Sequence, residues 1–232
     1  MSEQLAVTVP DGRFACHVER PDTPGPHPVI VVLQEIFGVN EGIRSIARKY
    51  AMKGYIAVAP DLFWRSEPGL SLSEGKEGHW KKGFELYAAY DMDRGVGDIA
   101  STVAASRTLA GASGKVGVTG YCMGGLLTFL SAARTDADAF VAYYGGGTDR
   151  YLEEARRIKA PLLYHLAGAD EYIGREAQQA ILAALDLLPS AEAHVYPGRD
   201  HAFARPNGAH HHEQDARLAN LKTDAFFMRY LR

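Results

Sequence analysis

A cysteine lies at the centre of a glycine-rich hexapeptide, residues 120–125, with the sequence GYCMGG. This G-x-nucleophile-x-G pattern, placed between a strand-like and a helix-like segment, is typical of a sharp corner that presents a nucleophile. Glycines are needed there because the corner residue takes strained dihedral angles and leaves no room for neighbouring side chains. The free N–H groups at the start of the helix favour a thiolate. The pattern therefore indicates Cys122 as a catalytic nucleophile; the alternative is a small buried cysteine before a helix.

Two residues that could activate and orient a thiol follow the cysteine, first an acid and then a histidine. The apolar run 162–167 leads into a Gly-x-Asp loop at Asp170, and the strand-like segment 193–196 leads to His201. Nucleophile, acid and histidine at successive strand ends form the triad arrangement of an α/β hydrolase. Alone, Asp170 could be a turn or N-cap residue, as could Asp200, and His201 is one of nine histidines. Their joint order favours a catalytic set.

Short apolar strands alternate with helical patterns along the chain. This alternation predicts a mostly parallel central sheet of about eight strands, flanked by helices on both faces. The expected strands are residues 5–10, 14–18, 29–34, 56–60, 116–119, 139–144, 162–167 and 193–196. The expected helices are residues 42–53, 93–109, 126–133, 150–158, 175–187 and 213–231.

Length and composition bound the kind of protein. The 232 residues contain no linker-like segment, which predicts a single domain over residues 1–232. A formal net charge of −3 argues against nucleic acid as the main partner. The N-terminus lacks the basic and apolar regions of a signal peptide, and no apolar run approaches the roughly 18 residues of a membrane span. We therefore expect a cytoplasmic protein with no membrane partner.

No metal or cofactor is expected. The two cysteines, Cys16 and Cys122, form neither a CxxC pair nor a ligand cluster, and Cys16 is expected to pack in a strand. The triple glycine at 145–147 lacks the spacing of a dinucleotide-binding loop. The histidines at 210–212 are adjacent, so they point in different directions, and they are expected to form a surface loop or a helix start.

The chain resembles the dienelactone hydrolases, the carboxymethylenebutenolidases of the α/β-hydrolase superfamily. The resemblance runs nearly end to end, and the combination of a cysteine corner with the segment QEIFG is highly specific. The matching segments are QEIFG at 34–38, APDLF at 59–63, GVGD at 95–98, GYCMGG at 120–125, YYG at 143–145 and HAFAR at 201–205.

The resemblance implies a role for each residue of the catalytic set. Cys122 would be the nucleophile, His201 the general base and later the acid, and Asp170 the group that orients the imidazole. The oxyanion that forms during acyl transfer would be held by backbone N–H groups, one from Met123 after the nucleophile and one from Ile36 after the early strand.

A glutamate gains its role from the resemblance alone. In the family, the residue that matches Glu35 engages the resting thiol, and substrate binding displaces it, so that the thiolate forms only when it is needed. Such a device would protect Cys122 from oxidation. Without the resemblance, Glu35 would be taken for a solvent-facing carboxylate in a strand-to-helix loop.

Family substrates carry a carboxylate beside the lactone, held by cationic side chains. Arg205 matches one of these cations, and a guanidinium suits a carboxylate. The second is expected in a helical stretch at 73–90, where the matching position is Trp80. Lys81 could supply the missing contact, or Trp80 could line an apolar pocket. Lys81 and Lys82 could also form a solvated helix face.

The resemblance implies a cofactor-independent hydrolase that acts on a small, carboxylate-bearing lactone. Its reaction would open a dienelactone to maleylacetate through an acyl-enzyme on Cys122, in the degradation of chlorinated catechols. One alternative is a broader esterase or thioesterase of the same fold, favoured by a pocket without paired cations. Another is a non-catalytic ligand-binding protein, disfavoured by the complete set of nucleophile, acid and histidine.

Overall fold

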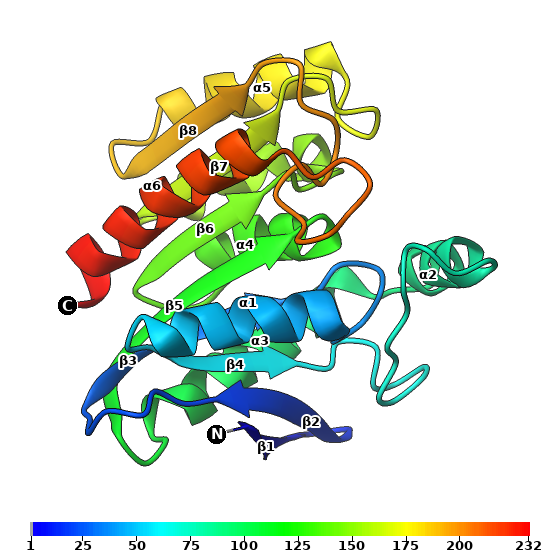
Figure 1. Cartoon of the computed structure of the whole chain (residues 1–232). Coiled ribbons are helices and arrows are strands. Elements are labelled where there is room, and N and C mark those ends of the chain that lie inside the picture. The colour runs from blue at the N-terminus through cyan, green and yellow to red at the C-terminus, as the bar shows by residue number, and fades with distance from the viewer. Residues whose placement is uncertain (1) are drawn as a thin grey trace. The chain divides into compact units, whose positions relative to one another are not determined.

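The computed structural model describes residues 2–232. They form two compact units, Met1–Val118 and Thr119–Arg232, and the chain passes from the first to the second within strand β5 (Ala112–Tyr121). Figure 1 shows the course of the chain by colour. The expectation of a single domain over residues 1–232 stays a prediction.

The first unit contains a sheet with the strand order β1-β2-β4-β3. Strands β1 (Ser2–Val9) and β2 (Gly12–Glu19) form an antiparallel hairpin, and β2 is also antiparallel to β4 (Ile56–Pro60). Strand β3 (His27–Leu33) runs parallel to β4. Both β3 and β4 are almost continuously apolar because helices cover the two faces of the sheet.

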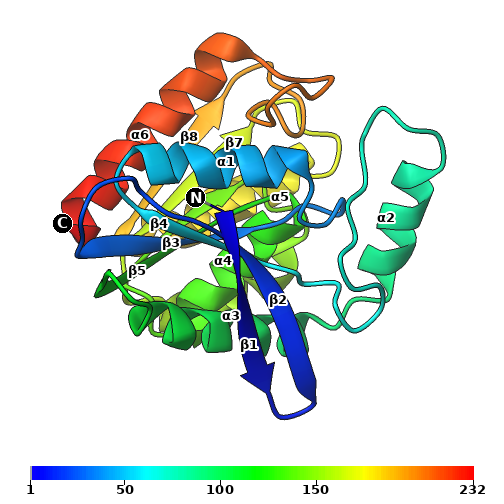
Figure 2. The same cartoon turned by 60° about the horizontal axis from the view of Figure 1, so that its bottom comes forward.

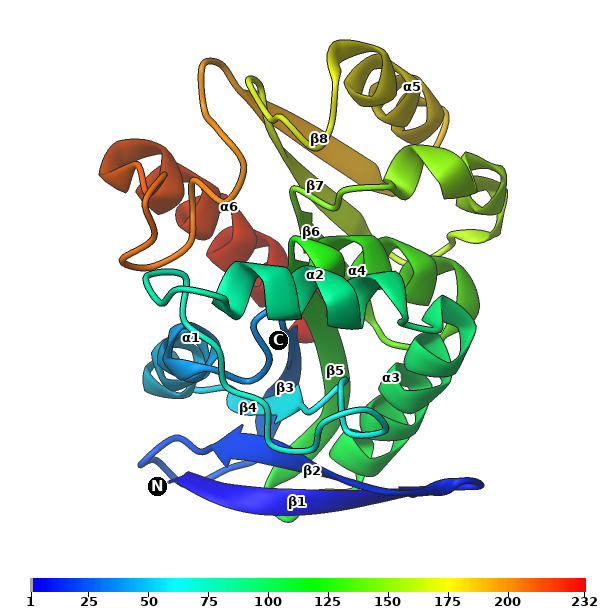
Figure 3. The same cartoon turned by 90° about the vertical axis from the view of Figure 1, so that its right-hand side faces the viewer.

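Helices α1 (Glu41–Met52) and α3 (Met92–Arg107) cover opposite faces of β3 and β4, as Figures 2 and 3 show. The N-terminus of α1 is capped by Asn40, whose side chain accepts a hydrogen bond from the Ile43 N–H. Helix α2 (His79–Ala88) stands apart from the strands of its unit in Figures 1 and 2.

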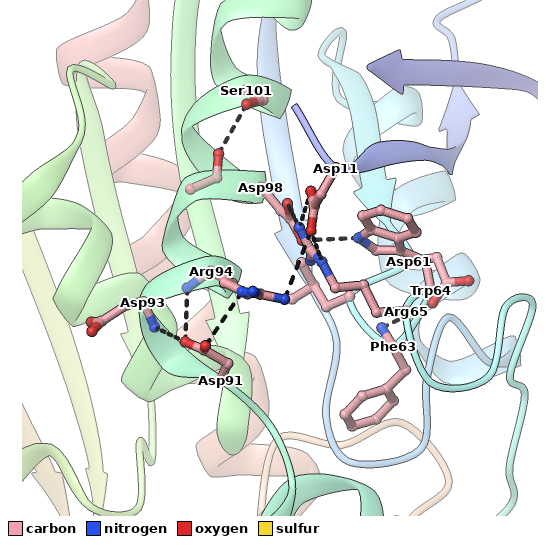
Figure 4. Close-up of polar contacts among 12 residues, drawn as sticks. Asp11, Asp61, Phe63, Trp64, Arg65, Asp91, Asp93, Arg94, Asp98 and Ser101 are labelled. Atoms are coloured by element: carbon pink, nitrogen blue, oxygen red, sulfur yellow. Dashed lines mark hydrogen bonds and ion pairs between the residues drawn. The ribbon is translucent and has the colours of Figure 1, made fainter. Parts of the chain in front are cut away.

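A polar cluster fastens α3 to the β1–β2 hairpin (Figure 4). The Arg65 guanidinium donates to Asp11 in the hairpin turn at 2.8 and 2.9 Å, and to the buried Asp98 of α3 at 2.5 and 3.0 Å. The Trp64 Nε1–H donates to the same Asp98 carboxylate at 2.9 Å. Asp98 is therefore a buried charge whose partners come from the loop after β4.

The second unit holds the end of β5 beside β6 (Ala139–Tyr143), followed by β7 (Leu162–Ala167) and β8 (Ala191–Tyr196). Strands β6, β7 and β8 are parallel. Figures 1 and 3 show α6 on one face of these strands and α4 and α5 on the other. The helical segments are α4 (Met123–Arg134), the 3₁₀ segment η1 (Thr148–Arg157), α5 (Arg175–Asp186) and α6 (Glu213–Leu231).

The predicted elements agree with the structure in order, but several differ in their ends and one differs in type. Strand β5 begins at Ala112 rather than at residue 116, and the helix expected within residues 73–90 spans His79–Ala88. Helix α4 begins directly at Met123, three residues before its predicted start, because the glycines after Cys122 already belong to its first turn. The segment predicted as a helix at 150–158 is a 3₁₀ segment with a kink at Tyr151. Within residues 2–232, no helix is long and apolar enough to cross a membrane.

Candidate active site

Cys122 occupies the corner between β5 and α4. Its backbone has φ 56° and ψ −117°, a strained conformation for a residue with a side chain. The Cys122 N–H donates to the Tyr143 carbonyl at 3.1 Å, and the Cys122 carbonyl accepts from Gly125 and Leu126. The thiol is partly exposed. This is the strained strand-to-helix turn that presents a nucleophile in hydrolases.

The glycines of the corner are required by close backbone approaches. A Cβ atom on Gly120 would lie 2.1 Å from the Gly124 carbonyl oxygen, and one on Gly125 would lie 2.2 Å from that of Tyr143. Neither contact can be relieved by rotating a side chain, because both involve backbone atoms. The corner can therefore close in this way only where these positions lack side chains.

Asp170 and His201 lie together just beyond β7 and β8, which are neighbouring parallel strands. The His201 Nδ1 atom is 2.9 and 3.1 Å from the two Asp170 carboxylate oxygens, and both residues are buried. A carboxylate only accepts hydrogen bonds, so Nδ1 carries the proton. The Tyr172 N–H also donates to Asp170, at 2.9 Å, which orients the carboxylate.

Backbone contacts tie the Asp170 loop to the His201 loop. The Gly168 N–H donates to the Tyr196 carbonyl at 2.9 Å, and the Ala169 N–H donates to the Arg199 carbonyl at 2.8 Å. A Cβ atom on Gly168 would lie 2.9 Å from the Tyr196 carbonyl oxygen. The absence of a side chain at position 168 therefore lets the two loops meet.

The other imidazole nitrogen of His201 is available to the thiol. Nε2 is buried and has no hydrogen-bond partner among the atoms of residues 2–232, and the His201 imidazole is close enough to Cys122 for the two groups to interact. Burial lowers the pKa of His201, but the negative charge of Cys122 and the Asp170 hydrogen bond outweigh it and raise the pKa to about 10. The site therefore favours the protonated form of His201.

Two tyrosines that were not predicted as site residues, Tyr144 and Tyr172, flank the His201 ring. The ring of Tyr144 lies 5.1 Å from the imidazole, and that of Tyr172 lies 4.8 Å away, both edge-on. Tyr172 is 46% exposed, so its ring lies between the imidazole and solvent. The available signal was position: Tyr144 directly follows β6, and Tyr172 comes two residues after the acid.

The second unit also carries one predicted oxyanion donor and one predicted anion-binding residue. Met123 is the first residue of α4, and no hydrogen bond from its N–H is found within residues 2–232, as is usual in the first turn of a helix. Arg205 is half-buried in the loop that carries His201. Both therefore belong to the unit that holds Cys122.

The other predicted donor lies in the first unit, in the loop after β3. Glu35 and Ile36 are both buried there, so Glu35 is not a solvent-facing carboxylate. The Ile36 N–H makes no hydrogen bond within residues 2–232, although the residue is only 2% exposed. A buried N–H without a partner is uncommon and suits a donor for a transient oxyanion.

The two substrate residues predicted on α2 differ in their surroundings. The Trp80 indole donates to the Glu74 carbonyl at 3.1 Å, and its ring lies edge-on to Phe37 at 4.9 Å. The Lys81 side chain is 83% exposed, with its Nζ atom 3.9 Å from Glu85. Trp80 therefore packs on the loop that carries Ile36, whereas Lys81 faces solvent.

The run of histidines at 210–212 belongs to the His201 loop. His210 Nδ1 lies 3.1 Å from the His201 carbonyl oxygen, and His212 caps the N-terminus of α6. The run was expected to form a surface loop or a helix start: His210 and His211 lie in an exposed loop, and His212 is the N-cap of the helix that begins at Glu213. Across residues 2–232, no group of three or more histidine, cysteine or acidic side chains is arranged to hold a metal ion.

Comparison with known proteins gives the same family over most of the chain. The family model for the "Dienelactone hydrolase family" matches residues 14–231. A "Putative carboxymethylenebutenolidase" from Azospirillum brasilense is 42% identical over 222 residues, which cover 95% of each chain. A "Carboxymethylenebutenolidase" from Pseudomonas putida is 36% identical over 221 residues, covering 95% of this chain and 93% of the relative.

A solved structure shows the same fold. The crystal structure of a "Putative Dienelactone Hydrolase" from Klebsiella pneumoniae is similar to this chain, with a TM-score of 0.87 and 28% sequence identity. The similarity covers 99% of both chains. The chain therefore has the α/β-hydrolase fold, with a mostly parallel sheet and helices on both of its faces.

Proposed function

The chain belongs to the dienelactone hydrolase family and is a hydrolase, and we propose that it opens a small unsaturated lactone through an acyl-enzyme on Cys122. The observation that carries this proposal is the arrangement in the second unit. His201 is oriented by Asp170 through Nδ1, which leaves Nε2 unpartnered, and the imidazole interacts with Cys122 at the strained corner. These are the relations required of a base and its nucleophile.

In the first half of the reaction, the Cys122 thiolate attacks the lactone carbonyl carbon. The carbonyl electrons move to oxygen, and the resulting oxyanion accepts hydrogen bonds from the Met123 and Ile36 N–H groups. When the tetrahedral intermediate collapses, the bond to the ring oxygen breaks, which opens the ring and leaves an enolate on the acyl chain that stays bound to Cys122. The His201 imidazolium can supply the proton that this enolate takes up.

In the second half, water hydrolyses the thioester. A base, either neutral His201 or the enolate of the bound acyl chain, removes a proton from water, and the oxygen attacks the acyl carbon. The carbon–sulfur bond breaks, which regenerates the thiolate and releases a carboxylic acid. From a dienelactone, the product would be maleylacetate.

Two further residues of the proposal come from the family resemblance. Glu35 engages the resting thiol until substrate displaces it, and the burial of Glu35 supports this role over that of a solvated loop carboxylate. Arg205 binds the substrate carboxylate, supported by its place on the His201 loop. Roles in chlorinated catechol degradation and in the cytoplasm stay predictions.

A second candidate function is a broader esterase or thioesterase of the same fold. The observation that favours it is on α2, where the position of the second anion-binding cation is occupied by Trp80 and the neighbouring Lys81 faces solvent beside Glu85. A pocket with one cation would discriminate less strongly in favour of carboxylate-bearing lactones.

The two candidates are separated by comparing substrates. The loss of dienelactone ultraviolet absorbance and the hydrolysis of p-nitrophenyl acetate are measured for the wild type and for Cys122→Ala. Lactone turnover that is faster than ester turnover, and abolished by the substitution, supports the lactonase. Ester cleavage without lactone turnover supports the esterase, and binding of the lactone without any turnover would support a ligand-binding protein.

A further inference from the structure

The peptide group between Glu35 and Ile36 is held through its carbonyl. Two groups donate hydrogen bonds to the backbone carbonyl oxygen of Glu35. They are the Gly38 N–H, at 3.3 Å, and the Gln34 side-chain nitrogen Nε2, at 3.4 Å. A peptide group is planar, so a group that fixes the carbonyl also fixes the direction of the N–H on its other side. That N–H belongs to Ile36, the predicted oxyanion donor.

The Gln34 side chain is itself held in one orientation. It is fully buried, and its oxygen Oε1 accepts a hydrogen bond from the Leu62 N–H at 3.0 Å. Since Leu62 presents a donor, the amide oxygen must face it, and the NH₂ group must face Glu35. The amide therefore cannot flip without leaving a buried N–H unpaired.

The Leu62 N–H is held in place because hydrogen bonds fix the conformation of the loop around it. The neighbouring Asp61 carboxylate is buried and accepts hydrogen bonds from the Phe63 N–H at 3.1 Å and the Gly69 N–H at 2.7 Å. Gln34 thus connects the Glu35–Ile36 peptide to a loop whose shape is held by a buried carboxylate.

Backbone contacts hold the other end of the loop after β3, at Phe37 and Gly38. The Leu72 N–H donates to the Phe37 carbonyl at 2.8 Å, and a Cβ atom on Gly38 would lie 2.1 Å from the Leu70 carbonyl oxygen. Helix α2 approaches at Gly83, where a Cβ atom would lie 2.9 Å from the Ile36 carbonyl oxygen. These contacts hold the peptides after Ile36, while Gln34 acts on the peptide before it.

We propose that Gln34 is a positioning residue for the oxyanion hole: its amide holds the Glu35–Ile36 peptide so that the Ile36 N–H stays directed at the developing oxyanion. This assignment rests on the proposed function, in which the Ile36 N–H is a donor. Such donors work because they are oriented before the reaction, and loss of one costs about a hundred- to a thousand-fold in rate. A donor that is misdirected rather than lost should cost less.

The test variant is Gln34→Met, which keeps the length and neutrality of the side chain and removes the amide. The matched control is Asn40→Ser. It removes the Asn40 Nδ2 donor to the Leu72 carbonyl, a bond of 3.1 Å that braces the same loop elsewhere, and it keeps an oxygen that can cap α1. Circular dichroism establishes that both variants fold.

Two rates are measured on each variant. The first is p-nitrophenyl acetate hydrolysis, resolved into kcat and KM. The second is alkylation of Cys122 by iodoacetamide, a displacement of iodide that forms no oxyanion. Burial raises the pKa of the other thiol, Cys16, to about 12, so alkylation reports on Cys122.

The proposal expects Gln34→Met to lower kcat and kcat/KM together by about 10- to 100-fold, because the lost interaction acts only in the transition state. KM and the alkylation rate should stay within about threefold of wild type, and Asn40→Ser should lower kcat by less than about threefold. If Gln34→Met does not fold, Gln34→Asn, whose amide is one methylene too short to reach both Leu62 and the Glu35 carbonyl, is expected to show the same loss.

Three results would overturn the assignment. A wild-type kcat in a folded Gln34 variant removes the positioning role alone and leaves the proposed function intact. A parallel fall in turnover and alkylation shows general distortion of the site. A wild type that hydrolyses neither ester nor lactone removes the proposed function, and the Gln34 assignment with it.

Discussion

The Nδ1 atom of His201 lies 2.9 Å from the Oδ2 atom of Asp170, with both side chains almost completely removed from solvent. This contact joins the loops after two neighbouring parallel strands, β7 and β8. It determines which imidazole nitrogen carries the proton and leaves Nε2 for the Cys122 thiol.

Asp170→Asn should lower kcat by about a hundred- to ten-thousand-fold with little change in fold. An asparagine amide can donate to Nδ1, which stabilises the wrong imidazole tautomer. The control is Asp200→Asn, the same change at an exposed carboxylate next to His201. Steady-state kinetics on p-nitrophenyl acetate check the prediction. An equal loss in both variants would show that Asp170 has no special role.

Cys122→Ala should lower the pKa of His201 below its wild-type value. Of the influences that raise this pKa, the negative charge of Cys122 is the largest, and the substitution removes it while burial, which lowers the pKa, remains. Titration of the imidazole followed by NMR measures the change. Cys16→Ala, which removes the other cysteine, should leave the His201 pKa unaltered. A His201 pKa insensitive to Cys122→Ala would contradict the interaction between Cys122 and His201.

Gly168→Ala should reduce both stability and turnover. Its Cβ atom would meet the Tyr196 carbonyl oxygen at 2.9 Å, so the Asp170 and His201 loops must separate, at a cost of about 1–3 kcal/mol. Thermal unfolding and kcat are the measurements. Gly97→Ala in α3 is the control, since its Cβ would meet nothing within 4 Å and alanine is the better helix former. Full activity in Gly168→Ala would show that the loops do not depend on this close approach.

Arg65→Ala should destabilise the fold by about 2–3 kcal/mol. The substitution removes the cation that pairs with the buried Asp98, and the Trp64 indole is then its remaining side-chain donor in the cluster of Figure 4. Urea denaturation measures the loss. Arg94→Ala, which removes an exposed arginine with ion pairs of 3.6 and 3.9 Å, should change the free energy of unfolding by about 0.5 kcal/mol or less. Equal effects would mean that burial of Asp98 carries no penalty.

Much of the fold could be predicted because apolar runs and glycines report directly on local structure. Strands 56–60 and 162–167 and the helix 213–231 have the predicted boundaries. The kink at Tyr151 was missed, because helical periodicity does not distinguish a 3₁₀ segment from an α-helix.

The candidate site could be predicted only in part. The glycine spacing predicted the corner at Cys122, and the places of Asp170 and His201 after successive strands predicted that they belong to the same catalytic set. The ring of Tyr172 against His201, and the amide of Gln34 on the Glu35 carbonyl, depend on how loops meet in three dimensions. Hydrophobic periodicity predicts helices and strands but does not predict contacts between loops.

The central claim, an acyl-enzyme on Cys122, is tested most directly by trapping it. The protein is mixed with p-nitrophenyl acetate, quenched in acid during turnover, digested and analysed by mass spectrometry. An acetyl group is expected on the peptide that contains Cys122, and none on the corresponding peptide of Cys122→Ala. Continued turnover with no acetyl group on Cys122, or with the acetyl group on another side chain, would contradict the central claim.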